Sequence, residues 1–265
     1  MPTLHANGID IYYERRGEGP PLLFFNGSGA TLETTSLMLD PYTERFDVVA
    51  HDQRGLGKTS IPPGPYEMAD YAADAAALID HLGWDTCRVV GTSFGGMVAQ
   101  EFAVTWPERV ERLALVCTSP GGKFAAFGLH TLESKSGDEL AAIGATLLDT
   151  RFTPEWLAEH DNDRMIAEMV AQRRAAPAPD PEVARGQREQ LLARSRLDVL
   201  DRLDRITCPT LVASGKYDGI SPPENGAAIA ERVPDATLRV YEGGHMFFGQ
   251  DPAAMPEILD FLADE

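Results

Sequence analysis

The sequence predicts an α/β protein with a mostly parallel sheet, helices on both faces and an inserted helical cap. Three observations carry this prediction. Short apolar runs alternate with stretches of helical periodicity along most of the chain, a pattern that favours a parallel sheet buried on both faces. That rhythm stops between residues 121 and 205, where helical patterns alone occur. A serine flanked by glycines, Gly91-Thr92-Ser93-Phe94-Gly95, marks the change from an apolar strand to a helix.

Composition limits the classes of function. The chain has 265 residues, of which 43% are apolar, and this suits one large α/β unit with an insertion. Its 23 basic and 41 acidic residues give a net charge of −18, spread along the chain. Such a charge opposes binding to nucleic acid and to anionic membrane surfaces. We therefore expect neither nucleic acid nor a membrane as a partner, and the oligomeric state stays open.

The cysteine and histidine patterns indicate neither disulfides nor a metal site. Cys87, Cys117 and Cys208 each lie in or beside an apolar run, so we expect buried free thiols. The histidines lack metal-ligand spacing, and we expect neither a metal nor a cofactor. The chain does not open with a basic segment followed by a long apolar one, and no apolar run reaches the length of a membrane span. These features predict a reducing, cytoplasmic location.

The chain is expected to start with a β-hairpin. Thr3–Ala6 and residues 9–14 alternate in polarity around Asn7-Gly8, a dipeptide typical of tight hairpin turns. Residues 22–25 form an unbroken apolar run, typical of a strand buried on both faces, and lead into the loop Asn26-Gly27-Ser28-Gly29, which leaves backbone N–H groups free. Helices over 35–45, 67–82 and 97–103 and strands over 46–50, 87–90 and 110–117 then follow in alternation.

One segment imitates a nucleotide-binding site. Gly57-Lys58-Thr59 resembles the end of a phosphate-binding loop, but that pattern needs a glycine where Asp52 stands. It also needs a helix afterwards, which the prolines of residues 61–65 forbid. We therefore assign no nucleotide site.

Residues 121–205 are expected to form the helical cap, and residues 1–120 and 206–265 the core domain. Apolar stripes at helical spacing run through 140–148 and 165–170, and Thr153-Pro154 has the pattern of a helix start. A proline-rich stretch over 175–181 breaks the second stripe. Such stripes mostly pack the interior, and some could roof a pocket.

The strand pattern returns at 210–214 and 237–241, with helices over 223–232 and 252–262. Asp218 and His245 each follow one of these strands, as Ser93 follows residues 87–90. Functional side chains of parallel sheets gather at the carboxyl ends of the strands. A serine hydroxyl becomes nucleophilic when a histidine takes its proton, and a buried carboxylate fixes the tautomer of that histidine. The order Ser93, Asp218, His245 therefore predicts a catalytic triad.

The turn around Ser93 favours this role. A sharp strand-to-helix turn strains the backbone of the serine and leaves no room for side chains at Gly91 and Gly95. It exposes the hydroxyl above the sheet and aims the N–H of Phe94 at the same point.

Together these motifs resemble the α/β-hydrolase fold family, in the form with an eight-stranded sheet and a helical cap after the sixth strand. The resemblance covers nearly the whole chain and rests on Asp52-Gln53-Arg54-Gly55-Leu56-Gly57, Gly91-Thr92-Ser93-Phe94-Gly95-Gly96, Trp106-Pro107-Glu108-Arg109-Val110, Gly215-Lys216-Tyr217-Asp218 and Gly243-Gly244-His245. It implies an oxyanion hole formed by the backbone N–H groups of Phe94 and Ser28. The commonest family pattern has His-Gly where this chain has Asn26-Gly27. Members that resemble 3-oxoadipate enol-lactonases also carry an asparagine there.

We therefore expect a serine hydrolase that cleaves a carboxylic ester or lactone of a small molecule through an acyl-enzyme. The expected pocket residues are Asn26, Gly27, Met246 and Trp156, with Asn26 bracing the oxyanion loop or touching substrate. Three alternatives stay open: a C–C bond hydrolase, a cofactor-free oxygenase on the same scaffold, and a ligand-binding protein without turnover.

Cys117 and Arg54 are two further candidates for the site. Cys117 is not expected to be a nucleophile, because it lies within an apolar strand with no histidine near it in the pattern. Arg54 could be structural or could line the pocket, and the family resemblance favours the structural role.

The charge of the substrate is the last expectation. A net charge of −18 opposes the approach of a lactone that carries a carboxylate, and such a substrate would need a local cation. Most cap arginines are expected on solvated helix faces: Arg151, Arg164, Arg173, Arg174, Arg185, Arg188, Arg194 and Arg196. A neutral or largely apolar ester or lactone is therefore expected to be preferred.

Overall fold

The strands form one sheet in the order β1-β2-β4-β3-β5-β6-β7-β8, in a computed structural model that describes residues 2–135, 137–174 and 179–264. Their bounds are β1 Thr3–Ala6, β2 Ile9–Arg16, β3 Pro21–Phe25, β4 Asp47–His51, β5 Cys87–Thr92, β6 Val110–Val116, β7 Thr210–Gly215 and β8 Ala236–Tyr241. β2 pairs antiparallel with both β1 and β4, and every other pairing is parallel. The prediction of a mostly parallel, eight-stranded sheet is confirmed for the described part of the chain.

The helices are α1 Leu32–Thr43, α2 Met68–His81, α3 Phe94–Thr105, α4 Gly137–Leu148, α5 Pro154–Glu159, α6 Asp161–Arg174, α7 Pro181–Arg196, α8 Pro223–Arg232 and α9 Ala254–Ala263, with short 3₁₀ turns η1 Pro107–Arg109, η2 Leu129–Ser134, η3 Leu200–Arg205 and η4 Phe247–Gly249. α1 begins three residues earlier than expected. The reason is a reciprocal cap, in which the N–H of Thr31 donates to Thr34 Oγ1 at 3.1 Å and the N–H of Thr34 donates to the Thr31 carbonyl at 3.0 Å.

Helices cover both faces of the sheet and produce two apolar layers. α2, α3 and α8 pack against one face, where Leu23 of β3 meets Phe102 of α3 in one cluster. α1 and α9 pack against the other face, where Leu22 clusters with Leu39 and Ile258. All five side chains are at most 1% exposed. Because neighbouring residues of β3 enter opposite layers, this strand must be apolar along its whole length.

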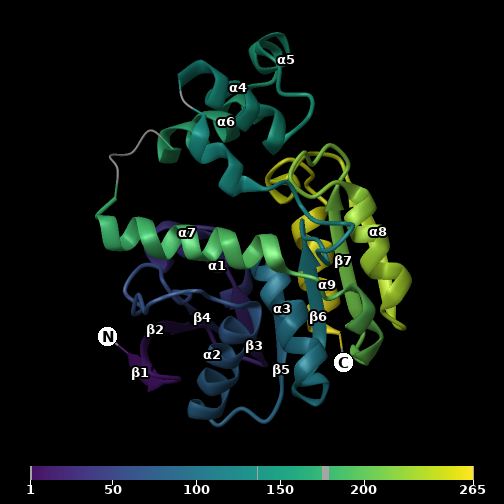
Figure 1. The fold of residues 1–265 in the computed structure, drawn as a ribbon. Helices are drawn as coiled ribbons and strands as arrows, with labels where there is room; N and C mark the ends of the chain where they lie inside the picture. Colours follow the sequence, from purple (N-terminus) through teal and green to yellow (C-terminus); the bar gives the residue numbers. More distant parts are fainter. Residues whose placement is uncertain (1, 136, 175–178, 265) are drawn as a thin grey trace.

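The helices between β6 and β7 lie at one end of the sheet. Figure 1 shows α4, α5 and α6 gathered together, while α7 lies apart from them, across the core. Arg185 of α7 donates to the carbonyl oxygens of Ile61 and Pro62 at 2.9 and 2.7 Å, and Arg196 donates to that of Tyr66 at 2.6 Å. α7 is therefore fixed to the loop that precedes α2. The division into a core and a cap at residues 121 and 205 stays a prediction, and the helix break expected over 175–181 falls partly on residues 175–178, outside the described residues.

The apolar stripes of the sequence do not mark α7. The buried residues of this helix are Gly186, Gln190, Ala193 and Arg194, which have helical spacing but are small or polar. Asp180 caps the helix by accepting the N–H of Glu182 at 2.9 Å. Hydrophobic periodicity therefore does not reveal this helix, although one side of it is buried.

Three smaller predictions also have outcomes. Cys87, Cys117 and Cys208 are buried free thiols, as expected, and burial raises the pKa of Cys87 to about 12. After Gly57-Lys58-Thr59 the next helix is α2, so the helix that a phosphate-binding loop needs does not follow. Within the described ranges, no helix combines the length and the apolar character needed to cross a membrane.

Candidate active site

Ser93 lies at a strained turn between β5 and α3. Its φ of 56° and ψ of −115° place it in a backbone region that residues other than glycine rarely adopt. A Cβ on Gly91 would collide with the backbone of Gly95, and a Cβ on Gly95 would collide with the carbonyl of Phe25. The N–H of Ser93 donates to the Val116 carbonyl at 2.8 Å. The flanking glycines therefore let strand, helix and neighbouring loop approach closely, and the predicted elbow is present.

Ser93, His245 and Asp218 form one hydrogen-bonded chain. His245 Nε2 lies 3.0 Å from Ser93 Oγ, and His245 Nδ1 lies 2.8 Å from Asp218 Oδ2. Because an ionised carboxylate can only accept, Nδ1 carries the hydrogen, and Nε2 of the neutral ring accepts from the serine hydroxyl. Asp218 Oδ1 also accepts the N–H groups of Ile220 and Ser221, both at 2.8 Å. The structure therefore brings together the three residues predicted as a triad, each at most 8% exposed.

Opposing effects act on the imidazole of His245. Burial disfavours its charged form, whereas the charge of Asp218 and the hydrogen bond to Asp218 favour it. Burial is the largest single effect, but Asp218 and Cys117, which lies beside the ring and acts in the same direction, together outweigh it. The pKa of His245 is therefore raised above its ordinary value of 6.5.

The sequence pattern placed no histidine near Cys117, whereas the structure brings its thiol beside His245. β6 ends at Val116, so Cys117 lies just after the strand, with φ of 44°. That Cys117 is not the nucleophile stays a prediction.

The loop that carries His245 is fixed to the helices above it. The N–H of His245 donates to the carbonyl of Leu148, at the end of α4, at 2.6 Å. The N–H of Gly244 donates to Gln250 Oε1 at 2.8 Å. The amide nitrogen of Gln250 then donates to Asp149 at 3.0 Å and to Asp163 at 2.9 Å. The position of the imidazole is therefore coupled to that of α4 and α6.

The loop after β3 passes beside the nucleophile. A Cβ on Gly27 would lie 3.7 Å from the Cβ of Ser93, in ordinary contact. The carbonyl of Asn26 accepts the side-chain amide of Gln53 at 2.7 Å, so Gln53 braces the loop. The side chain of Asn26 is buried, and its Nδ2 has no hydrogen-bond partner within the described residues. This brace holds the backbone of Asn26, whereas the expected bracing or substrate contact by its side chain stays a prediction.

A residue that sequence reasoning missed fixes the other side of this loop. The N–H of Gly29 donates to Oε1 of Gln190 at 2.7 Å. Gln190 belongs to α7 and is fully buried. No signal in the sequence could have found it, because a glutamine in a polar helix normally lies on a solvated face.

The remaining predicted residues differ in their surroundings. Met246 directly follows His245 and is partly exposed. The indole N–H of Trp156 donates to Asp163 at 2.7 Å, and its ring stacks on that of His160 with centroids 3.7 Å apart. These contacts hold Trp156 within the cap, so its pocket role gains no support from them and stays a prediction.

Arg54 binds the carboxylate of Asp74 through two nitrogens, each at 2.9 Å. Asp74 also accepts the side-chain amide of Asn7 at 2.9 Å. Arg54 thereby ties the loop after β4 to α2 and to the opening hairpin. These contacts fit the structural role that the resemblance implies.

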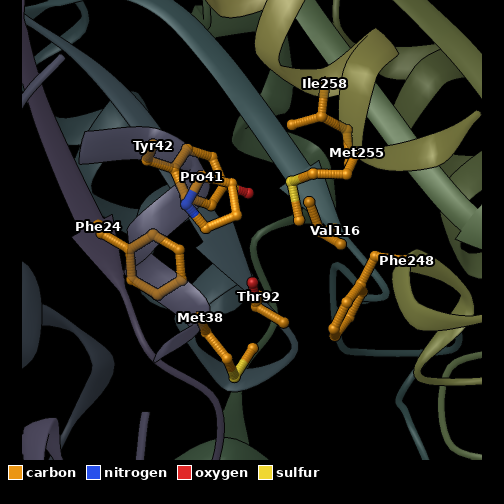
Figure 2. A pocket seen from close by; sticks show the side chains of 9 residues that line it. All are labelled: Phe24, Met38, Pro41, Tyr42, Thr92, Val116, Phe248, Met255 and Ile258. Carbon is orange, nitrogen blue, oxygen red and sulfur yellow. The ribbon is translucent and has the colours of Figure 1, made fainter. Parts of the chain in front are cut away.

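Two of the cavities that adjoin the elements of the triad lie between pairs of helices. One, of about 500 Å³, lies between α4 and α6, and its lining includes Leu140, Leu148 and Val170 from the two predicted stripes. Leu148 is also the residue whose carbonyl holds the N–H of His245. The other, of about 80 Å³, lies between α1 and α9. Figure 2 shows Phe24 and Thr92 from the sheet, with Tyr42 and Met255 from the two helices, around it.

The comparisons with known proteins agree with this geometry. Residues 20–252 match the family described as "alpha/beta hydrolase fold". The chain is 30% identical over 264 residues to an Azorhizobium caulinodans protein that carries the name carbamate hydrolase RutD, covering 98% of this chain and 97% of that one. It is 28% identical over 262 residues to 3-oxoadipate enol-lactonase 2 of Acinetobacter baylyi, covering 97% and 94%.

Solved structures show the same fold. The enol-lactonase from Burkholderia xenovorans LB400 superposes with a TM-score of 0.81 over 99% of this chain and 100% of that one, at 22% identity. At this identity the likeness concerns the fold alone. The family match, which spans most of the chain, decides the assignment: this chain belongs to the α/β-hydrolase fold family and is an α/β-hydrolase enzyme.

Proposed function

We propose that this enzyme is a serine hydrolase that cleaves a carboxylic ester or lactone of a small molecule through an acyl-enzyme. The hydrogen-bonded chain from Ser93 through His245 to Asp218 carries the proposal, with distances of 3.0 and 2.8 Å. The names of two relatives support the class of bond, because a carbamate and an enol-lactone both join an acyl carbon to a heteroatom.

In the first half-reaction, Ser93 Oγ attacks the acyl carbon while its proton passes to His245 Nε2. Asp218 keeps the imidazole oriented and stabilises the imidazolium that forms. The carbonyl oxygen becomes an oxyanion facing the N–H of Phe94 and the N–H of Ser28. Phe94 begins α3, so its N–H has no carbonyl four residues earlier in the helix to bind. The C–O bond then breaks, and Nε2 returns the proton to the leaving alkoxide.

In the second half-reaction, water replaces the alcohol. His245 Nε2 takes a proton from this water as its oxygen attacks the acyl carbon. The bond to Ser93 breaks, and the serine oxygen receives the proton from Nε2. An ester thus gives an acid and an alcohol, whereas a lactone gives one hydroxy acid.

The proposal extends to the surroundings of the enzyme. Three buried free thiols support a reducing, cytoplasmic compartment. The acidic surface and the cavity between α4 and α6 support a small molecule as the partner. Cell fractionation of the tagged chain tests the first point.

Active-site labelling tests the proposal most directly. The wild-type protein should hydrolyse p-nitrophenyl butyrate and take up one fluorophosphonate, located on Ser93 by peptide mass spectrometry. Ser93→Ala should abolish both signals with an unchanged melting temperature. Ser134→Ala, which removes an exposed hydroxyl, is the matched control and should retain both. A folded wild-type protein that neither labels nor turns over, or that labels on Cys117, would refute the proposal.

A further inference from the structure

A buried arginine of α7 faces a cavity next to the triad. Arg194 is 5% exposed, and its Nη1 donates to the carbonyl of Phe127 at 2.5 Å. Its Nε and Nη2 have no hydrogen-bond partner within the described residues. Arg194 lines a cavity of about 230 Å³ together with Met97, Ser119 and His130. One edge of the guanidinium is thus left without a partner.

An unpaired cation in this position is costly. Burial lowers the pKa of Arg194 to about 10, although the charge of Asp218 acts in the opposite direction. The side chain is therefore still charged at neutral pH. A buried charge whose N–H groups lack acceptors destabilises the folded protein, and an anionic partner removes that penalty.

The unpaired edge has the shape that fits a carboxylate. Elsewhere in the chain, three arginines hold an aspartate through Nε and Nη2 together, at distances from 2.6 to 2.9 Å. These pairs are Arg15–Asp47, Arg54–Asp74 and Arg151–Asp149. Nε and Nη2 are the atoms of Arg194 that lack a partner. Two parallel N–H groups match the two oxygens of one carboxylate.

Other polar groups face the same cavity. The hydroxyl oxygen of Ser119 accepts the N–H of Ala126 at 3.2 Å, which leaves its own hydrogen for a ligand. Nδ1 of His130 is buried and has no partner within the described residues. Both side chains can therefore add hydrogen bonds to an anion held by Arg194.

The cavity borders the nucleophile elbow. Met97 lies one helical turn after Ser93 on α3 and lines the cavity. Ser119 follows Thr118, whose hydroxyl donates to the Ser93 carbonyl at 2.8 Å. Asp218 acts electrostatically on Arg194 itself. A group bound here would therefore lie beside the elements that carry Ser93.

We propose that this cavity binds a carboxylate carried by the substrate, so that the enzyme prefers esters or lactones with a free carboxylate. The inference rests on the proposed hydrolase function and names its substrate class. It reverses the expectation drawn from the net charge of −18, because Arg194 supplies the local cation that such a substrate needs. A singly charged carboxylate suits the site better than a phosphate dianion, because the negative charge of Asp218 acts on the same place.

Paired substrates test the preference. Mono-p-nitrophenyl esters of succinate, glutarate and adipate, which keep one free carboxylate, are compared with the same p-nitrophenyl esters in which that carboxylate is a methyl ester. The spontaneous rate of hydrolysis is subtracted for each substrate. At the best chain length, the free acid should have a kcat/KM at least about tenfold above that of the methyl ester. Arg194→Met should remove this preference by lowering kcat/KM for the free acid at least about tenfold. Arg188→Met removes an exposed charge from the same helix and should keep the preference.

The salt dependence distinguishes the attraction by Arg194 from the repulsion by the acidic protein surface. Raising the ionic strength should increase kcat/KM for the free acid, since salt screens the repulsion from the acidic surface more than it screens the buried arginine. A free acid no better than its methyl ester at any chain length overturns the inference, while hydrolysis of the methyl ester still supports the hydrolase. A preference that survives in Arg194→Met also overturns it.

Binding without turnover provides a second readout. Glutarate should raise the melting temperature of the Ser93→Ala protein. The rise should be absent when Arg194→Met is added. It should be smaller with Arg194→Lys, which keeps the positive charge but loses the two parallel N–H groups of the guanidinium. Inorganic phosphate is the comparison ligand. A larger shift with phosphate than with glutarate, or an unchanged glutarate shift after Arg194→Met, would contradict a carboxylate site.

Discussion

The triad and the cavity lined by Arg194 differ in whether their buried polar groups have hydrogen-bond partners. At the triad, Asp218 accepts three hydrogen bonds, and both ring nitrogens of His245 have partners. Around the cavity, Arg194 and His130 keep nitrogens that have no hydrogen-bond partner among the described residues. The groups proposed to react thus form hydrogen bonds with one another, while the groups proposed to bind the substrate carboxylate keep nitrogen atoms with which a ligand can form hydrogen bonds.

The difference has a physical reason. Groups that stabilise developing charge act best when they are oriented before the reaction, and complete pairing provides that orientation. A recognition group must instead keep its hydrogen-bonding capacity for the ligand, at some cost in the stability of the free protein. Loss of a triad residue should therefore affect turnover most, whereas loss of a cavity residue should affect specificity and stability.

The largest expected effect concerns the triad. Ser93→Ala and His245→Ala should each lower kcat by about 10⁴-fold or more, and the double variant should be little worse than either, because the residues act as one unit. Steady-state kinetics with p-nitrophenyl butyrate and a melting curve for each variant provide the measurement. If the two losses multiply in the double variant, the triad assignment is wrong.

The second largest expected effect concerns Ser28, in the loop after β3. Ser28→Ala keeps the backbone N–H and should cost less than about threefold, whereas Ser28→Pro removes that N–H and should cost about 100-fold or more in kcat. Comparable melting temperatures of the two variants would show that the loss is not due to unfolding. A large loss in Ser28→Ala would instead give the hydroxyl a role in the site.

The pH dependence tests the charge of Asp218. Only the neutral imidazole can accept the serine proton, and Asp218 raises the pKa of His245. The acid limb of kcat/KM should therefore have its midpoint above pH 6.5. In Asp218→Asn the charge is lost while burial remains, so the midpoint of the residual activity should fall by about one unit or more. An identical midpoint in both proteins would show that another group titrates.

The smallest effect concerns stability. Arg194→Met replaces an incompletely paired buried charge by an apolar chain, so its melting temperature should equal or exceed that of the wild type by up to a few degrees. In contrast, Arg54→Met breaks a largely buried ion pair held by two hydrogen bonds and should lower the melting temperature clearly. Calorimetry of both variants checks the contrast. A comparable loss in the two would mean that Arg194 has a structural partner.

The sequence alone was sufficient to predict the sheet and to bring Ser93, Asp218 and His245 together. The inner parallel strand β3 is buried on both faces, so it appears in the sequence as a continuous apolar run over residues 22–25. The edge strand β8 is partly exposed and mixes polar with apolar residues. Because the carboxyl ends of parallel strands meet at one edge of a sheet, the three residues could be placed together from their positions after three predicted strands. The glycines around Ser93 marked the elbow, because close backbone approach excludes a side chain.

Tertiary structure decided which polar residues are buried and which of them have partners. α7 covers the core with Gly186, Gln190, Ala193 and Arg194, and none of these residues is large and apolar. Hydrophobic periodicity reports only apolar burial, so it could not mark this helix, the anchor of Gly29 or the buried arginine. The net charge of the sequence likewise describes only the electrostatic potential far from the protein surface, not the charge at one site. Which arginine is unpaired depends on contacts made by segments far apart in the chain, and these exist only after folding.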